Sequence, residues 1–183
     1  MRQMIILFCV AGLCTACNNS ESAKDDTKSN AKVANATDEK MDYAYTIEHP
    51  DQWEMGNKQH TQMVLASLKG FENGNMDEAT KNFADTVQLS FDGFEAKVSR
   101  DSAKALFTQS WNQMKNLKIF MDDFESVRSK DSTMEYVSLW YKEKWQDDKG
   151  TWDSLSVMDD LRIKDGKIAS IDEKLRHFDK KKK

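Results

Sequence analysis

The chain has 183 residues and a formal net charge of −4, with 27 Lys and Arg set against 31 Asp and Glu. This length suits one domain of ordinary size once an N-terminal leader and a linker are set aside. Basic residues are interspersed with acidic ones, so no basic face indicates a nucleic-acid partner, and we exclude that class.

Residues 1–16 have the pattern of a signal peptide: Arg2 precedes an apolar run over residues 4–13, and small residues follow. The run is shorter than the roughly 20 apolar residues of a membrane-spanning helix. Its end resembles a bacterial lipobox, whose Cys is lipidated and becomes the mature N-terminus. Cys17 matches that Cys, although Cys14 stands where the motif usually has Leu, Val or Ile. We expect a lipid-anchored protein of the bacterial cell envelope, on the periplasmic side or the cell surface. The alternatives are an ordinary secretory signal cut at a small-residue site, or a buried helix.

All three cysteines of the chain lie in this leader, so the mature chain keeps only the lipid-bearing Cys17. We therefore expect no disulfide, no thiol chemistry and no zinc site built on cysteine. Adjacent acidic pairs occur at residues 122–123 and 159–160, but neighbours on a strand point to opposite faces. We predict no metal site and no cofactor.

Residues 17–45 contain almost no large apolar residue and are expected to form a disordered tether. Residues 46–56 read as an extended arm, because they contain the only proline, Pro50, and the large aromatic Trp53, which should pack on the domain. The folded domain spans residues 57–178, and residues 179–183 are a charged tail.

The domain opens with helical spacing from His60 to Phe71 and a break at residues 72–75. A second short helical pattern runs from Met76 to Phe83. Alternating residues at 86–91 and 94–98 then form a hairpin across Asp92-Gly93.

A third helical pattern, capped within residues 99–102, reaches Leu117. Strand patterns follow at residues 118–128, 133–145, 151–163 and 168–178, and they read as an antiparallel meander. Helices followed by a mostly antiparallel sheet indicate an α+β fold with the helices packed on one face.

This order of elements resembles the nuclear transport factor 2 superfamily, with its SnoaL-like and ketosteroid isomerase-like branches. The matching residues are 71–75 at the exit of the first helix, 83–85 before the first strand, and 158–168 around the last hairpin. The resemblance implies a cone-shaped, cystatin-like fold in which a strongly curved sheet wraps the helices. It also implies that a pocket often lies between them and that the protein is often a dimer.

In the isomerase branch, the pocket uses a Tyr on the first helix, a carboxylate base at the end of the first strand and a protonated acid on the penultimate strand. The matching positions hold Ser67, Phe91 and Asp159, so only the acid is retained. Isomerase chemistry of that kind is not expected.

Asp159 is the main candidate for a polar group inside the cone, because its alternating neighbours on the strand are apolar. A carboxyl in such surroundings should have a raised pKa. The alternative is that Asp159 bonds a backbone group or an Arg and only holds the sheet. Further pocket candidates are Ser67, Phe91, Tyr141 and Asp85, although a turn-ordering role for Asp85 is the simpler reading.

No catalytic residue is assigned. The three histidines, His49, His60 and His177, lie far apart in the sequence and next to no Ser or Cys pattern that would indicate a nucleophile.

Both faces of the strand over residues 133–145 are apolar, so one should fill the cone and the other should be covered. Tyr136 and Trp140, with Trp152 and Met158 on the next strand, predict a homodimer or partner surface. An arm carrying Trp53 over the sheet is the alternative.

The sequence thus favours an exported lipoprotein whose domain binds a small apolar or mixed ligand, or a partner protein, without catalysis. The alternative is a SnoaL-like isomerase, cyclase or dehydratase that uses Asp159 as acid or base. An open cone of more than about 300 Å³ around Asp159 would favour ligand binding or catalysis. A filled cone would favour an interaction module.

Overall fold

The computed structural model describes residues 42–49 and 52–178. From Tyr45 onward the described residues belong to one structural unit, and residues 42–44, which belong to the preceding unit, contain no helix or strand. The predicted signal peptide, Cys17, most of the tether and the tail lie outside the described residues. Within the described part, no helix has both the length and the apolar character needed to span a membrane.

One curved sheet forms the unit, with the strand order β1-β4-β5-β6-β7-β2-β3. All neighbouring strands are antiparallel except β2 and β7, which are parallel. The strands are β1 (Trp53–Met55), β2 (Phe83–Phe91), β3 (Phe94–Ser99), β4 (Lys115–Ser129), β5 (Glu135–Gln146), β6 (Trp152–Lys164) and β7 (Lys167–His177). The α+β class with a long antiparallel meander is confirmed.

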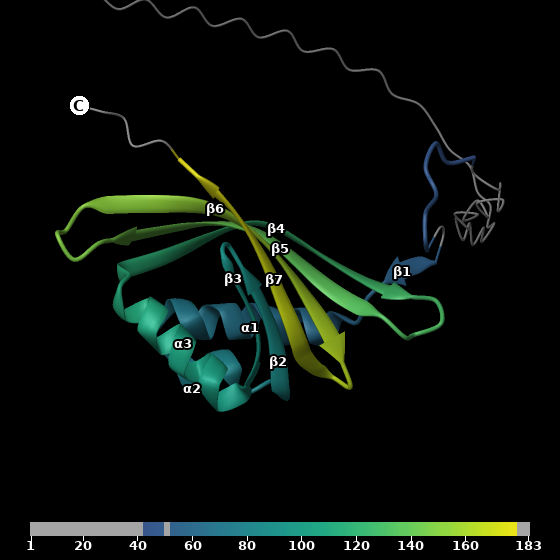
Figure 1. Cartoon of the computed structure of the whole chain (residues 1–183), viewed down its shortest axis with the longest axis horizontal. Coiled ribbons are helices and arrows are strands. Elements are labelled where there is room, and N and C mark those ends of the chain that lie inside the picture. The colour runs from purple at the N-terminus through teal and green to yellow at the C-terminus, as the bar shows by residue number, and fades with distance from the viewer. Residues whose placement is uncertain (1–41, 50–51, 179–183) are drawn as a thin grey trace, which may run out of the picture. The chain divides into compact units, whose positions relative to one another are not determined.

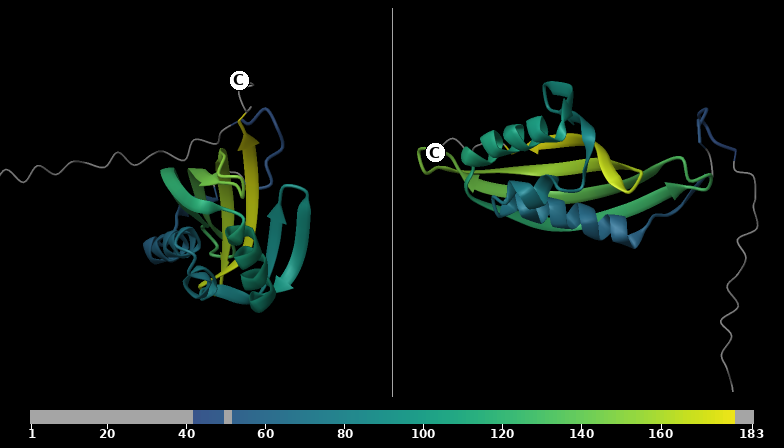
Figure 2. Two further views of the ribbon diagram at one scale, coloured as in Figure 1. Left: turned by 90° about the vertical axis from the view of Figure 1, so that its left-hand side faces the viewer. Right: turned by 90° about the horizontal axis from the view of Figure 1, so that it is seen from below.

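Three helices lie on the same side of this sheet (Figures 1 and 2). They are α1 (Lys58–Glu72), α2 (Met76–Thr80) and α3 (Arg100–Asn112). The cap of α1 is Asn57, whose side chain accepts a hydrogen bond from the Gln59 backbone N–H at 2.9 Å. After α1 the chain turns at Gly74, which has a φ of +72° that favours glycine.

Two boundaries differ from the sequence-based prediction. Phe83 begins β2 rather than ending the second helix, because it pairs with Ile168 of β7 and is 1% exposed. Leu117 lies in β4 rather than at the end of α3, which stops at Asn112. At both places helical spacing and strand alternation fit the same apolar residues, and long-range strand pairing decides between them.

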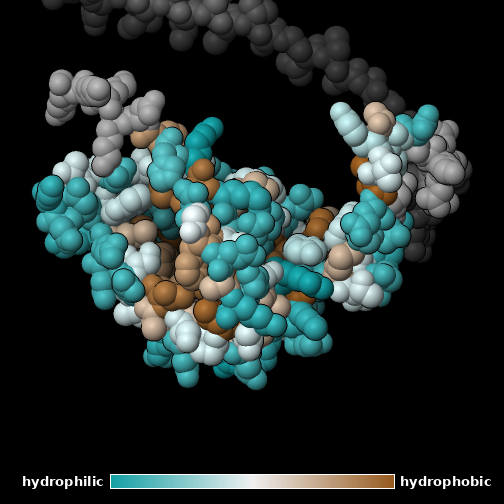
Figure 3. Space-filling model, viewed as in Figure 1, coloured by the Kyte–Doolittle hydropathy of each residue, from teal (hydrophilic) through white to brown (hydrophobic). Residues whose placement is uncertain are grey.

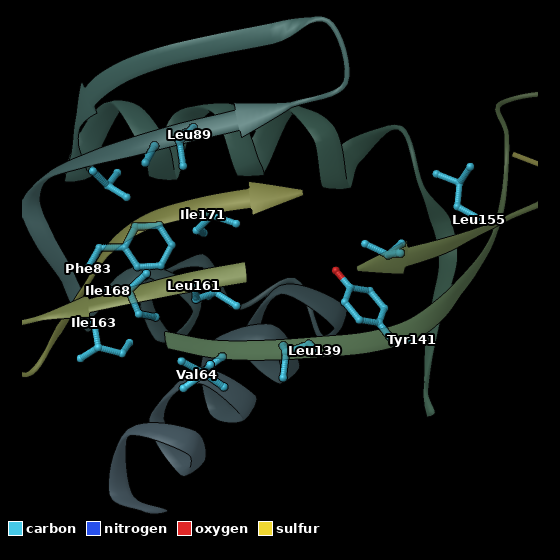
Figure 4. Packing of buried hydrophobic residues seen from close by; sticks show 14 residues of the cluster. Val64, Phe83, Leu89, Leu139, Tyr141, Leu155, Leu161, Ile163, Ile168 and Ile171 are labelled. Atoms are coloured by element: carbon cyan, nitrogen blue, oxygen red, sulfur yellow. The ribbon is translucent and has the colours of Figure 1, made fainter. Parts of the chain in front are cut away.

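The concave face of the sheet carries the core. Val137, Leu139 and Tyr141 of β5 point to this side and are nearly fully buried, which fixes the orientation of that strand. They meet apolar residues of α1, β2, β6 and β7, and Figure 4 shows these side chains pointing toward one another.

The arm ends in β1, which pairs with β4 at the sheet edge. The ring of Trp53 meets that of Tyr136 edge-on at 6.0 Å between centroids. Through β1 and Trp53 this segment contacts the sheet edge and one of the aromatic residues on the convex face.

Candidate functional site

A cavity of about 490 Å³ opens on the concave side of the sheet, between the sheet and the helices. Five phenylalanines belong to its wall: Phe71, Phe83, Phe91, Phe94 and Phe107. Figure 3 shows hydrophobic residues gathered around a hollow on this side, while hydrophilic residues cover most of the visible surface. The cone is open rather than filled.

The sheet brings three carboxyl groups to the wall of this cavity: Asp159 of β6, Glu173 of β7 and Glu143 of β5. Asp159 is paired directly with Glu173, so both side chains leave the sheet on the same face. Glu143 shares that face because it lies two residues beyond Tyr141 on β5. Asp159 and Glu143 are each 6% exposed.

Asp159 has one hydrogen-bond partner and one free oxygen. The Tyr141 hydroxyl donates to Asp159 Oδ2 at 2.8 Å. The other oxygen, Oδ1, is buried without a hydrogen-bond partner among the described residues. Asp159 is therefore bonded to Tyr141 rather than to a backbone group or an Arg, and its second oxygen is an unsatisfied buried acceptor beside the cavity.

Burial raises the pKa values of all three carboxyls. The pKa of Asp159 rises to about 7, chiefly through burial, while the hydrogen bond from Tyr141 acts in the opposite direction. Burial and the nearby Asp159 raise the pKa of Glu143 to about 7. The same two causes, with smaller effects of Glu143 and Asp92, raise the pKa of Glu173 to about 8.

Burial also raises the pKa of Tyr141 well above its ordinary value, with added repulsion from Asp159. Tyr141 therefore stays a hydroxyl donor. A carboxyl that titrates near neutral pH can both give and take a proton, so the group of Asp159, Glu143 and Glu173 has the properties of general acids and bases.

Four of the five predicted pocket residues line this cavity: Ser67, Phe91, Tyr141 and Asp159. The Ser67 hydroxyl is engaged in a hydrogen bond to the Ala79 carbonyl of α2.

The fifth residue, Asp85, does not line the cavity. Its side chain is 93% exposed and pairs with Arg100. Regular alternation would place Asp85 on the same face as the buried Phe83 and Val87. The pairing of β2 with β7 is irregular between Phe83 and Gln88, and Asp85 is exposed instead.

The sequence-based reading missed Glu143 and Glu173. The signal was present, because Glu143 interrupts the apolar series of Tyr141 and Trp145, and Glu173 interrupts that of Ile171 and Leu175. An acidic residue at a core-facing position of a strand is the kind of exception that indicates a site.

The histidines stand apart from the cavity. His60 Nδ1 lies 2.8 Å from Glu135 Oε1, and exposed His177 lies 3.7 Å from Asp92. Among the described residues, no group of three or more His, Cys, Asp or Glu is arranged to hold a metal ion.

On the convex face, Tyr136, Trp140 and Met158 are half-buried and Trp152 is 49% exposed, with Lys144 Nζ 4.8 Å from its ring centroid. The homodimer through this face stays a prediction.

No model of a known protein family matches the chain, and no curated protein matches it. Its fold is shared with solved structures. An LEH-like epoxide hydrolase of M. tuberculosis is 12% identical, with 65% of this chain and 84% of that chain covered and a TM-score of 0.53.

Two further solved structures share this fold. An uncharacterized cystatin-fold protein of Novosphingobium aromaticivorans is 10% identical, covers 66% of this chain and 99% of that chain, and gives a TM-score of 0.54. A protein of Catenulispora acidiphila with a ketosteroid isomerase-like fold, in complex with trimethylamine, is 14% identical to this chain. The match covers 62% of this chain and 84% of that chain, with a TM-score of 0.52. The chain therefore has the nuclear transport factor 2-like fold of SnoaL-like and ketosteroid isomerase-like proteins.

Proposed function

We propose that the cavity binds a small, largely apolar molecule and exchanges protons with it, with Asp159 as the acid or base. One observation carries the proposal: Asp159 Oδ1 is buried against the cavity with no hydrogen-bond partner in the described part of the chain. Tyr141 holds the other oxygen and orients the carboxyl. The pKa of about 7 leaves both protonation states accessible near neutral pH.

The size and lining of the cavity support ligand binding over a purely structural domain. Its volume of about 490 Å³ lies within the range of roughly 300 to 1,000 Å³ typical of small-molecule sites. Its wall combines apolar surface with few polar groups, which is the usual composition of such sites. A protein-interaction module with a filled cone would lack this space.

Catalysis is proposed in addition to ligand binding because two further carboxyls lie on the cavity wall with Asp159. Glu143 and Glu173 can hold or pass on a proton that Asp159 removes, since they share its face of the sheet. The M. tuberculosis neighbour is described as an epoxide hydrolase, so the fold also carries enzymes.

Proton exchange provides the test. The purified full chain is incubated in D₂O with a set of small cyclic ketones, and deuterium incorporation beside the carbonyl is followed by NMR. We expect exchange above the buffer rate, reduced at least about 100-fold in Asp159→Asn. Asp160→Asn is the matched control, because Asp160 points to the other face and pairs with Lys174 at 2.9 Å.

Two outcomes count against the proposal. Exchange at the buffer rate while native mass spectrometry finds a bound ligand would leave a binding module without catalysis. Equal exchange by wild type and Asp159→Asn would remove Asp159 from the chemistry.

We further propose that the protein is exported and anchored to the membrane through lipid on Cys17, which the lipobox-like residues 14–17 support. Mass spectrometry of the mature N-terminus should find a lipidated Cys17 in the membrane fraction, and Cys17→Ser should lack the modification. An unmodified wild-type N-terminus would contradict the anchor.

A further inference from the structure

We propose that the cavity selects a small organic cation, a ligand whose apolar groups surround a positively charged nitrogen. This inference rests on the proposed function, because it names the class of molecule that the same cavity takes. Three features carry it: the charge of the wall, the free oxygen of Asp159 and the aromatic lining.

The wall carries acidic groups and no basic group. Asp159, Glu143 and Glu173 line the cavity, and none of its lining residues, all of them described, is Lys, Arg or His. The cation that acts on Asp159 most strongly is Lys174, but its Nζ is held at 2.9 Å by both Asp160 and Asp172 on the outer face. A cationic ligand would supply the missing positive charge inside.

The free oxygen of Asp159 favours the same class of ligand. Asp159 is 6% exposed and Oδ1 has no partner among the described residues, so its acceptor capacity is unused in a place that water hardly reaches. Leaving a buried acceptor unsatisfied is unfavourable, and an ammonium group or its polarised methyl groups would satisfy it. An anionic ligand would add repulsion to three acidic neighbours.

The aromatic lining suits an alkylated ammonium group. Five Phe rings and Tyr141 face the cavity, and Phe83 and Phe91 each pack on Phe107 with centroids 5.7 and 6.2 Å apart. Ring faces attract desolvated cations, and quaternary ammonium groups are commonly bound in this way. A bare metal ion is disfavoured because no described cluster offers it three or more ligands.

Binding should be linked to proton release. The three carboxyls hold protons near neutral pH because burial and their mutual repulsion raise their pKa values. Repulsion from Asp160 and Asp172 raises the pKa of Asp159 further, and repulsion from Asp92 raises that of Glu173, whereas Lys174 lowers the pKa of Asp159. A permanent cation among the three carboxyls favours their ionised forms. Affinity for that cation should therefore rise between pH 6 and pH 8.

The test compares benzyltrimethylammonium with neopentylbenzene, its uncharged carbon isostere, and with benzenesulfonate as an anion of similar size. Dissociation constants are measured on the full chain by NMR titration at pH 6 and pH 8. We expect the cation to bind at least tenfold more tightly than the isostere at pH 8, to gain about tenfold from pH 6 to pH 8, and to release protons into a weak buffer. Benzenesulfonate should bind most weakly.

Substitutions in the cavity wall test whether its acidic residues cause the preference for the cation. Glu173→Gln should reduce the preference for the cation over the isostere, whereas Asp172→Asn, one residue away on the outer face, should keep it. Circular dichroism confirms that both variants fold, and a Glu173→Gln chain that does not fold is replaced by Glu143→Gln in the same comparison. An isostere that binds as tightly as the cation would overturn the inference and leave the proposed function standing. If neither benzyltrimethylammonium, nor neopentylbenzene, nor any cyclic ketone bound, both this inference and the proposed function would be wrong.

Discussion

At the scale of single residues, two opposing influences act on Asp159. Burial raises its pKa, and the hydrogen bond from Tyr141 lowers it. The bond stabilises the ionised carboxylate as an acceptor, while the apolar wall disfavours the charge. Tyr141 is therefore a positioning residue that also tunes the acidity of Asp159.

Replacing Tyr141 by Phe should raise the pKa of Asp159 further, because it removes the donor at 2.8 Å and leaves the burial unchanged. Carboxyl ¹³C NMR titration of wild type and Tyr141→Phe measures this directly. Tyr136→Phe is the matched control, since Tyr136 lies on the other face of the same strand. A lower pKa of Asp159 in Tyr141→Phe would contradict the assignment.

At the scale of elements, the approach of α2 to α1 depends on Gly70. A Cβ at this position would lie 2.6 Å from the Ala79 backbone N and 3.0 Å from the Glu78 carbonyl carbon. These are backbone atoms, so the contact cannot be relieved by a side-chain rotation. The small residue in α1 thus sets how closely the helices can pack beside the cavity.

Gly70→Ala should lower the free energy of unfolding by about 1–3 kcal/mol, because overpacking outweighs the roughly 0.5–1 kcal/mol that Ala gains over Gly in a helix. Urea denaturation measures the change. Gln62→Ala, on the exposed face of the same helix, should change it by less than about 0.5 kcal/mol. A more stable Gly70→Ala chain would show that the two helices can separate at no cost.

At the scale of the whole molecule, the three buried carboxyls make stability depend on pH. Their pKa values lie above the ordinary values of 3.8 and 4.5, at about 7 for Asp159 and Glu143 and about 8 for Glu173. The folded chain therefore binds protons that the unfolded chain has released. Their contribution to stability is complete below about pH 4 and is lost as the pH rises through 7 to 8.

Glu143→Gln replaces one of the three buried carboxyls by an uncharged amide that does not titrate. It should raise the free energy of unfolding at pH 8 by roughly 1–3 kcal/mol relative to its effect at pH 5, since one pKa unit corresponds to about 1.4 kcal/mol. Urea denaturation at both pH values gives the difference. Glu125→Gln, at an exposed position of the same sheet, is the matched control. An equal effect of Glu143→Gln at pH 5 and pH 8 would mean that Glu143 is already ionised in the folded chain.

Much of the architecture follows from local patterns in the sequence. Alternation and turn residues predicted every strand from β2 to β7 within a few residues, because a half-buried strand repeats every two residues whatever its partners. Phe83 and Leu117 were misplaced because their apolar side chains fit both a helix and a strand. Only pairing with distant strands decided their state.

The site was predictable in part. Asp159 stood out in the sequence as a carboxyl at a core-facing position, and Tyr141 shared a face with apolar residues of its own strand. That the Tyr141 hydroxyl reaches Asp159, and that Glu143 and Glu173 join them, depends on the register of β5, β6 and β7. Register is set by tertiary pairing, and a shift of one residue would send each side chain to the opposite face.

The sequence by itself determined the class of fold, the order of its elements and the acidic residue at its centre, because periodicity and turn chemistry are local properties of the chain. Only the tertiary structure decided that the cone holds an open cavity and that three carboxyls lie on its wall. Their raised pKa values have the same origin, because burial and mutual repulsion arise only when strands distant in sequence lie side by side.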